Sequence, residues 1–472
     1  MTITGGKAKP KGVLWTPEHR VTTIGLLLMV TLIAFESMGV ATAMPTMVAD
    51  LDGLALYAWP FTTFLVASVV ATVLSGRIGD RRGPAPALLA GTALFAAGLL
   101  VAGLAHDMPS LLLGRGLQGF GSGLLLVSVS LLIALTFSDR ERPVIYAANA
   151  AAWVLPAVIG PSIAGVVTVS LGWRWVFLGL IPLTGIGLAL LVLVTRKLPR
   201  HVPGTSANRA GVVPAVVAAL GVAALTWAAQ HPSLPALAYG SAGLIALAYA
   251  LRKLLPAGTL TSRPGLPTVI ASRALIAGAY AGMEAYLPLT MSEVHGYSPA
   301  LAGLPLTVTA LGWSAGSLLQ GRHLDWSREA SLRTGFALVA AGLAIFAFVP
   351  LPSFPGWMAF VASAVGGAGM GIAMPAISVL LLRYSPEAER GFNTSALQLG
   401  DWVGSALTIG LGGVLLASIA SAKEPSVAIL VLSLLLTGLA LLGVRLTGRW
   451  PSGMTVADRG ADLANPLRPQ AP

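Results

Sequence analysis

Long apolar stretches are the feature that most constrains what this chain can fold into. A helix needs roughly 20 apolar residues to cross about 30 Å of hydrocarbon. Stretches of this kind lie at 21–47, 58–76, 85–105, 109–135, 144–168, 174–195, 212–230, 234–251, 267–291, 299–320, 334–350, 356–382, 392–420 and 425–446. Because backbone polar groups in lipid must be satisfied internally, the pattern predicts an all-α membrane protein with fourteen spans.

The composition excludes several classes of protein. Only 10% of the 472 residues are charged and the mean hydropathy is +0.81, whereas soluble domains carry about 25% charged residues. A soluble enzyme, a disordered chain and a disulfide-stapled secreted protein are therefore excluded. The chain has no cysteine and its six histidines show no metal-ligand spacing, so we expect no metal site. No phosphate-binding Gly-Lys-Ser/Thr loop or catalytic constellation is present, and we expect neither a cofactor nor an enzyme.

The basic residues are distributed unevenly between the predicted loops. With the N-terminus placed in the cytoplasm, the outside loops contain only Arg174 and Lys423. The inside loops and tails contain the basic clusters at 7–20, 77–82, 140–142, 196–209, 252–263, 322–333, 383–390 and from 445 onward. This is the positive-inside pattern, and it predicts an inner-membrane protein with both termini cytoplasmic. The net charge of +11 thus reports topology, and no nucleic-acid partner is expected.

An internal repeat divides the chain. At an offset of 248, Gly119, Gly121 and Gly123 recur as glycines, and the pair Glu141-Arg142 recurs as Glu389-Arg390. We therefore predict a cytoplasmic tail (1–20), a six-helix half (21–195), an inserted two-helix linker (196–266), a second six-helix half (267–446) and a disordered cytoplasmic tail (447–472). Two related helical halves are typical of transporters that bind substrate near the bilayer midplane, although a pore or receptor could also be duplicated.

Four motifs carry a resemblance to a known family. They are GRIGDRRG at 76–83, RGLQGFG at 115–121, PAVIGPSIAG at 156–165 and GWRWVF at 172–177. Together they resemble the major facilitator superfamily, and with fourteen spans the chain resembles its fourteen-helix drug–proton antiporter branch. The resemblance implies two pseudo-repeat halves that rock against each other, with the proton gradient as the energy source and no cofactor.

Ionisable residues inside the apolar spans are the strongest candidates for proton coupling. Only Glu36, Glu284 and Asp401 among the acidic residues lie well inside spans, where a charge costs about 2.5–3.5 kcal/mol. A buried carboxyl that holds either a proton or a cationic substrate provides the competition that an antiporter needs. Arg115 is the deep basic residue of the first half, and the resemblance implies a part in proton transfer. Arg273 is expected to extend to the cytoplasmic surface.

Two groups of residues are expected to control gating. The resemblance implies that the loop with Gly76, Asp80, Arg81 and Gly83 locks the halves at the cytoplasmic face, and Asp325 holds the matching place in the second half. We expect Asp80 at the N-terminus of the span at 85–105, where the helix dipole favours a carboxylate. Gly160, Pro161 and Gly165 are expected to break the fifth span, and the resemblance implies a hinge that prevents leak.

Polar and aromatic side chains at mid-span depth are candidates to line a substrate cavity, because aromatic faces suit flat or cationic ligands. They are Gln118, Asn149, Trp153, Tyr286, Trp313, Gln398 and Trp402. The leading hypothesis is a monomeric, proton-coupled antiporter that exports hydrophobic, often cationic drugs or natural products by alternating access. Export of a lipid, siderophore or other dedicated metabolite is the alternative, and a non-transporting membrane receptor or scaffold is a more distant one.

Overall fold

The computed structural model describes residues 14–138, 141–198, 211–231, 234–323, 326–386, 389–419 and 425–448, and the regular structure in these ranges is helical. The α-helices of the first half are α1 (Arg20–Asp50), α2 (Trp59–Arg82), α3 (Pro84–Gly103), α4 (Met108–Thr136), α5 (Arg142–Ser170), α6 (Arg174–Leu178) and α7 (Ile181–Thr195). Two helices follow, α8 (Val212–Gln230) and α9 (Leu234–Leu254). The second half contains α10 (Leu266–Leu289), α11 (Pro299–Ala302), α12 (Leu304–Arg322), α13 (Arg328–Phe348), α14 (Met358–Tyr384), α15 (Arg390–Ile419) and α16 (Ser426–Gly448).

The predicted all-α membrane architecture is confirmed. In the described ranges, thirteen helical segments are long and apolar enough to cross a membrane, and the apolar helical stretch Val212–Ala228 is a shorter fourteenth candidate. The protein is therefore a multi-pass membrane protein. Two predicted spans differ in detail, because 174–195 is divided into α6 and α7, and 299–320 into α11 and α12. Pro182 and Pro305 stand in the first turns of α7 and α12, where a missing N–H is tolerated and a new helix can begin.

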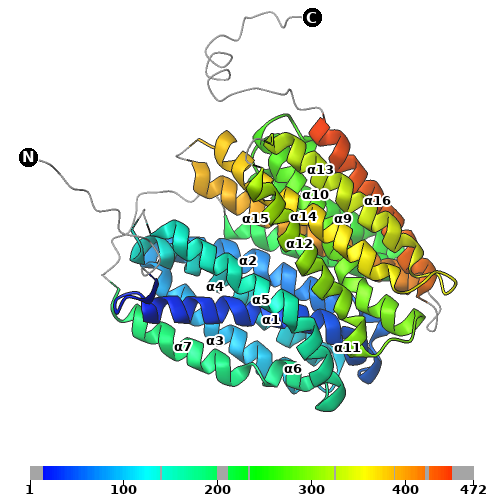
Figure 1. The fold of residues 1–472 in the computed structure, drawn as a ribbon, viewed down its shortest axis with the longest axis horizontal. Coiled ribbons are helices and arrows are strands. Elements are labelled where there is room, and N and C mark those ends of the chain that lie inside the picture. The colour runs from blue at the N-terminus through cyan, green and yellow to red at the C-terminus, as the bar shows by residue number, and fades with distance from the viewer. Residues whose placement is uncertain are drawn as a thin grey trace, which may run out of the picture.

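The repeat is visible in the helix packing. In the first half α1 packs on α5, and α4 packs on both α2 and α3. The second half repeats this pattern, since α10 packs on α15, and α14 packs on both α12 and α13. Figure 1 shows the first half at the lower left and the second half at the upper right. We call the end of the bundle at which α1 begins the near end, and the end at which α1 ends the far end.

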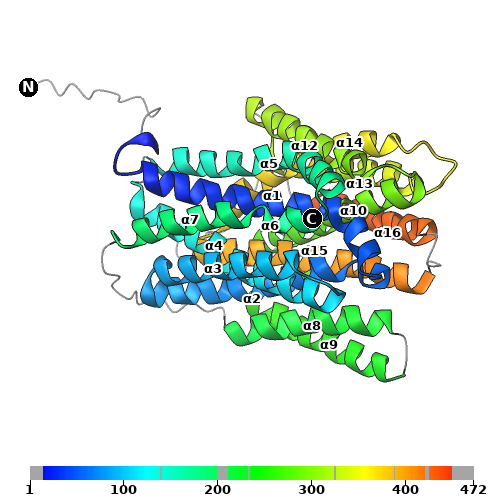
Figure 2. The same cartoon turned by 90° about the horizontal axis from the view of Figure 1, so that it is seen from below.

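Helices α8 and α9 lie beside the seam between the halves. They pack on each other, and α8 also packs on α2 of the first half and α15 of the second. Figure 2 shows this pair below α2, outside the two six-helix groups. The Trp59 and Trp227 rings meet edge to face with centroids 6.1 Å apart. The pair thus contacts one helix of each half, and it is not packed into either half.

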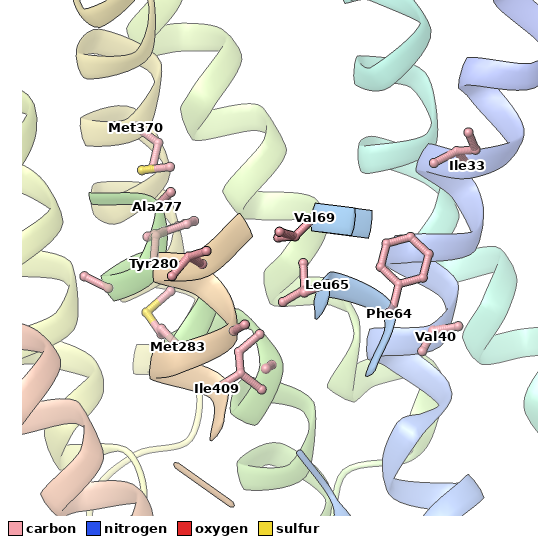
Figure 3. Packing of buried hydrophobic residues seen from close by; sticks show 14 of the residues in the cluster. Ile33, Val40, Phe64, Leu65, Val69, Ala277, Tyr280, Met283, Met370 and Ile409 are labelled. Atoms are coloured by element: carbon pink, nitrogen blue, oxygen red, sulfur yellow. The ribbon is translucent and has the colours of Figure 1, made fainter. Parts of the chain in front are cut away.

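A continuous apolar core joins the halves around the seam. Figure 3 shows Phe64 beside Ile33 and Val40 of α1. In the same view Tyr280 and Met283 of α10 lie near Ile409 of α15. The glycines of α4 and α14 allow these helices to approach their neighbours closely. A Cβ atom on Gly119 would lie 2.1 Å from the Phe64 carbonyl oxygen, and one on Gly371 would lie 2.1 Å from the carbonyl oxygen of Trp313.

Candidate functional site

A cavity of about 180 Å³ lies between the two halves. The first half contributes lining residues from α1, α2, α4 and α5, and the second half from α10, α12 and α15. The polar lining side chains are Ser37, Arg115, Glu284 and Ser405. The aromatic lining side chains are Phe61, Phe64, Trp153 and Trp402. A mostly apolar cavity with a few convergent polar groups is the usual form of a small-molecule site.

Glu36 and Arg115 form an ion pair at the wall of this cavity. The side chain of Glu36 is fully buried and that of Arg115 is 3% exposed, and Arg115 Nη1 donates to Glu36 Oε1. Arg115 lines the cavity, and Glu36 lies behind it. Because removing one partner of a buried pair leaves an uncompensated charge, neither side chain can be replaced alone without a large cost.

The remaining contacts of Arg115 hold its guanidinium in place. Nη1 also donates to Gln118 Oε1 at 2.7 Å, and Nε donates to the Pro60 carbonyl oxygen at 3.2 Å. The guanidinium carbon lies 4.6 Å from the centroid of the Phe64 ring, a cation–π arrangement. Glu36 Oε2 has no hydrogen-bond partner in the described part of the chain. One oxygen of the buried carboxylate is therefore open to accept a proton without displacing another bond.

Glu284 presents a different environment to the same cavity. Its partly exposed side chain lies on α10, and no hydrogen bond or ion pair to its carboxylate is recorded among the described residues. The neighbouring Tyr280 hydroxyl donates to Thr309 Oγ1 at 3.0 Å, so it is already engaged. Glu284 thus presents to the cavity a carboxyl group that has no cationic partner in the described part of the chain.

Asp401 is paired within the second half. Arg273 Nε donates to Asp401 Oδ2 at 3.0 Å, and Nη2 contacts the same oxygen. The two side chains are 20% and 19% exposed. The expectation that Arg273 extends to the cytoplasmic surface is therefore wrong, because a carboxylate on α15 faces it from inside the bundle. Neither residue lines the cavity.

The seven predicted cavity residues are placed in different surroundings. Trp153 and Trp402 line the cavity. Gln118 is buried against Arg115, and buried Tyr286 donates from its hydroxyl to the Ile409 carbonyl oxygen at 2.6 Å. Asn149, Trp313 and Gln398 are partly exposed and lie outside the cavity lining. Their contact with substrate stays a prediction.

The predicted cytoplasmic gate loop is mostly helical. Gly76, Asp80 and Arg81 all lie within the last two turns of α2, so the expectation that Asp80 begins the following span is wrong. The turn is confined to Gly83, whose φ of +78° is a conformation that favours glycine, and α3 begins at Pro84. Arg77 and Arg81 line a small surface hollow together with Val212 of α8. Asp325 lies outside the described residues.

Small residues of α5 pack against the second half at the far end. Helix α5 runs through Pro156 and Pro161 without a break, contrary to the expectation for Gly160, Pro161 and Gly165. A Cβ atom on Gly165 would lie 2.4 Å from Ala300 Cα, which shows how closely α11 approaches. A Cβ atom on Gly160 would make only ordinary contacts with Met38 and Phe35.

Two hydrogen bonds join the halves at this end. The buried Tyr57 hydroxyl donates to the Ala285 carbonyl oxygen at 2.7 Å. Thr307 Oγ1 of α12 donates to the Val158 carbonyl oxygen of α5 at 2.9 Å. Together with the Gly165–Ala300 approach, these bonds hold the far ends of the two halves together.

Several features of the site were missed from sequence. The repeat offset of 248 relates Glu36 to Glu284, both on the first helix of a half, and this relation was available from the numbering. The same offset relates Arg115 to Ser363. Phe61 and Phe64 could not be identified as cavity residues from the sequence, because aromatic residues at the start of an apolar span are equally typical of the membrane interface.

Comparisons with known proteins agree with this architecture. The profile described as Major Facilitator Superfamily matches residues 26–366 and 269–459. The MFS-type transporter ppz2 of Metarhizium majus is 27% identical over 447 residues, covering 86% of this chain and 73% of that protein. The multidrug transporter protein MdtP of Bacillus subtilis is 26% identical over 417 residues, covering 83% of this chain and 74% of that protein.

Solved structures support the fold. A POT family transporter crystallised with 5-aminolevulinic acid superposes with a TM-score of 0.69 at 14% identity, covering 91% of this chain and 96% of the other. Likeness at this level of identity concerns the fold alone. The repeated helix packing, the cavity between the halves and the profile match together show that the chain belongs to the major facilitator superfamily.

Proposed function

We propose that this protein is a proton-coupled antiporter that exports hydrophobic, cationic drugs or natural products across the inner membrane by alternating access. The observation that carries the proposal is the buried Glu36–Arg115 pair at the wall of the inter-half cavity. Two relatives support drug export, since one is a multidrug transporter and the other, dotC of Dothistroma septosporum, is an efflux pump. The motifs at 76–83 and 156–165 support the antiporter branch.

The ion pair offers a simple way to couple protons to substrate. When Glu36 is ionised, it neutralises Arg115. When Glu36 takes up a proton, its attraction to Arg115 is lost. The positive charge of Arg115 at the cavity wall is then no longer neutralised. A cationic substrate is then repelled. The proton and the substrate therefore exclude each other, which is the requirement for exchange.

The closed far end supports the alternating-access part of the proposal. Under the predicted topology the near end faces the cytoplasm and the far end faces outward. The Tyr57–Ala285 and Thr307–Val158 bonds close the far end. With the far end closed, the cavity does not exchange substrate on that side, and export requires these contacts to separate.

Transport in inside-out vesicles tests the proposal. An imposed pH gradient is expected to drive ethidium transport by the wild type and not by the Glu36→Gln/Arg115→Met double variant, because the amide cannot exchange a proton and no unpaired buried charge remains to destabilise the protein. Glu293→Gln is the control, since Glu293 is an exposed carboxylate that follows α10 and does not line the cavity. Failure of the wild type to move ethidium under any gradient would contradict multidrug export and favour a dedicated metabolite. Gradient-driven transport by the double variant at the wild-type rate would exclude Glu36 as the proton site.

A further inference from the structure

The cavity is charged asymmetrically, and this asymmetry bears on the substrate. Among its described lining residues, Arg115 and Glu284 carry the formal charges. Arg115 is neutralised from behind by Glu36. The local sum over these three side chains, with both carboxylates ionised, is one negative charge, and it resides on Glu284.

We propose that Glu284 is the receptor for the cationic group of the substrate, and that the site is built for a compact organic cation with a single positive charge. The inference rests on the proposed function. It gives the two repeat-related carboxylates, Glu36 and Glu284, different partners. Glu36 has a cation within the protein, whereas Glu284 takes its cation from the substrate. A second substrate charge would find no further carboxylate in the described lining.

The surroundings of Glu284 fit an organic cation better than a metal ion. A hard metal cation prefers several oxygen ligands, and no group of three or more acidic or histidine side chains that could hold a metal occurs in the described ranges. The cavity instead presents the rings of Phe61, Trp153 and Trp402. Aromatic faces attract quaternary and protonated amines, and the attraction grows when water is excluded.

Trp402 also carries a buried polar atom without a partner among the described residues. Its Nε1 is buried and has no hydrogen-bond partner in the described part of the chain, although the residue lines the cavity. An indole N–H donates only, and this one could reach an acceptor atom on a substrate only after the Trp402 ring turned toward the cavity. The aromatic and apolar lining leads us to expect a ligand that combines one cationic nitrogen with an aromatic or apolar body.

Size sets a further limit on the ligand. The cavity volume of about 180 Å³ lies below the range of about 300–1,000 Å³ for drug-sized ligands. In this closed-far-end state the site thus accommodates the charged head of a substrate, or a whole substrate of about ten heavy atoms. Trimethylphenylammonium meets these requirements, and its charge does not depend on pH.

Equilibrium binding to the purified full-length protein in detergent tests the proposal without any proton gradient. Calorimetry at one pH would compare trimethylphenylammonium with its uncharged carbon analogue tert-butylbenzene, each at its measured free concentration. Glu284→Gln is expected to weaken trimethylphenylammonium at least tenfold, which is about 1.4 kcal/mol, and to leave tert-butylbenzene unchanged. Glu284→Asp keeps the charge and is expected to retain most of the affinity, which controls for misfolding.

A double variant separates the two carboxylates. Glu36→Gln with Arg115→Met removes both charges of the internal pair and leaves Glu284 as the negative charge of the site. Trimethylphenylammonium should bind this variant within threefold of the wild type. The doubly charged 1,4-phenylenebis(trimethylammonium) should bind the wild type no more tightly than the single cation.

Three results would overturn the assignment. The first is wild-type affinity for trimethylphenylammonium in Glu284→Gln, and the second is loss of that affinity in the double variant, which would make Glu36 the receptor. The third is tenfold tighter binding of the double cation. Because binding needs no gradient, these results are independent of whether vesicles show proton-driven transport. Absent transport would reject the proposed coupling and leave the binding assignment standing.

Discussion

The first helices of the two halves place a glutamate at the same repeat position and surround it differently. Glu36 on α1 is fully buried and paired with Arg115 of α4. Glu284 on α10, 248 residues later, is partly exposed to the cavity. At the repeat position of Arg115, helix α14 carries the buried Ser363. Both halves therefore keep a glutamate at this position, but the first half pairs it with Arg115, whereas the second half has Ser363 at the position of that arginine.

The side chains around each glutamate show how this difference is built. Gln118 in the first half accepts a hydrogen bond from Arg115, and its repeat position in the second half is Gly366. A Cβ atom on Gly366 would lie 2.8 Å from Tyr280 Cε2, so the glycine leaves room for that ring. At this repeat position the second half leaves room for the Tyr280 ring. The first half instead carries Gln118, which contacts the internal cation Arg115. This teaches that pseudo-symmetric positions can diverge in charge while the helix packing stays the same.

Replacing Arg115, the internal cation, should lower the stability of the protein more than any of the other substitutions below. Arg115→Met leaves Glu36 as an uncompensated buried charge, and we expect the free energy of unfolding to fall by about 3–5 kcal/mol. Thermal unfolding in detergent measures the change. Adding Glu36→Gln should recover most of the loss, because no unpaired charge then remains. Equal stability of Arg115→Met and the wild type would show that the pair does not hold α1 against α4.

Filling the space beside Tyr280 should have the next largest effect. Gly366→Ala is expected to displace the ring and lower the free energy of unfolding by about 1–3 kcal/mol. Gly438→Ala on α16 is the matched control, since a Cβ atom there meets nothing within 4 Å. That variant should be neutral or slightly stabilising. If Gly366→Ala also behaved as neutral, the packing difference between the halves would be incidental.

The Arg273–Asp401 pair of the second half should contribute less to stability than the Glu36–Arg115 pair of the first half. Arg273 and Asp401 are each about one-fifth exposed, so water screens the charge that remains when one partner is removed. Arg273→Met should cost about 1–2 kcal/mol of unfolding free energy, between the values for exposed and buried pairs. Arg383→Met, which breaks a more exposed pair with Glu329 at 3.2 Å, should cost about 0–1 kcal/mol. A larger loss for Arg273→Met than for Arg115→Met would reverse the comparison.

Loss of the Tyr280 hydroxyl should have a smaller effect than loss of Arg273. Tyr280→Phe removes one buried hydrogen bond to Thr309, for which about 0.5–1.5 kcal/mol is expected. Because the ring remains in place, trimethylphenylammonium binding should change less than twofold. A tenfold loss of cation affinity would instead mean that the hydroxyl contacts the ligand.

Sequence reasoning reached the fold more fully than the site. The apolar stretches and the repeat predicted the helices and their two halves, but the breaks before Pro182 and Pro305 needed the structure, since short turns within an apolar run do not lower its hydropathy. Asp80 was assigned to the wrong helix because α2 continues through charged residues that a hydropathy pattern excludes.

The side-chain partners could be predicted only in part. Glu36 and Arg115 were identified singly as costly charges within the membrane, whereas their contact depends on how α1 meets α4. Arg273 and Asp401 were equally visible as opposite charges inside spans, but 128 residues separate them and only the packing of α10 on α15 brings them together. Gln118 was expected in the cavity, and its bond to Arg115 holds it in the wall instead.

Cation-driven proton movement tests coupling through the Glu36–Arg115 pair most directly. In proteoliposomes at clamped zero voltage, a gradient of trimethylphenylammonium should drive protons in the opposite direction through the wild type. The Glu36→Gln/Arg115→Met double variant should still bind the cation and move no protons. Proton movement by the double variant at the wild-type rate, or cation movement by the wild type without any proton movement, would contradict coupling through this pair.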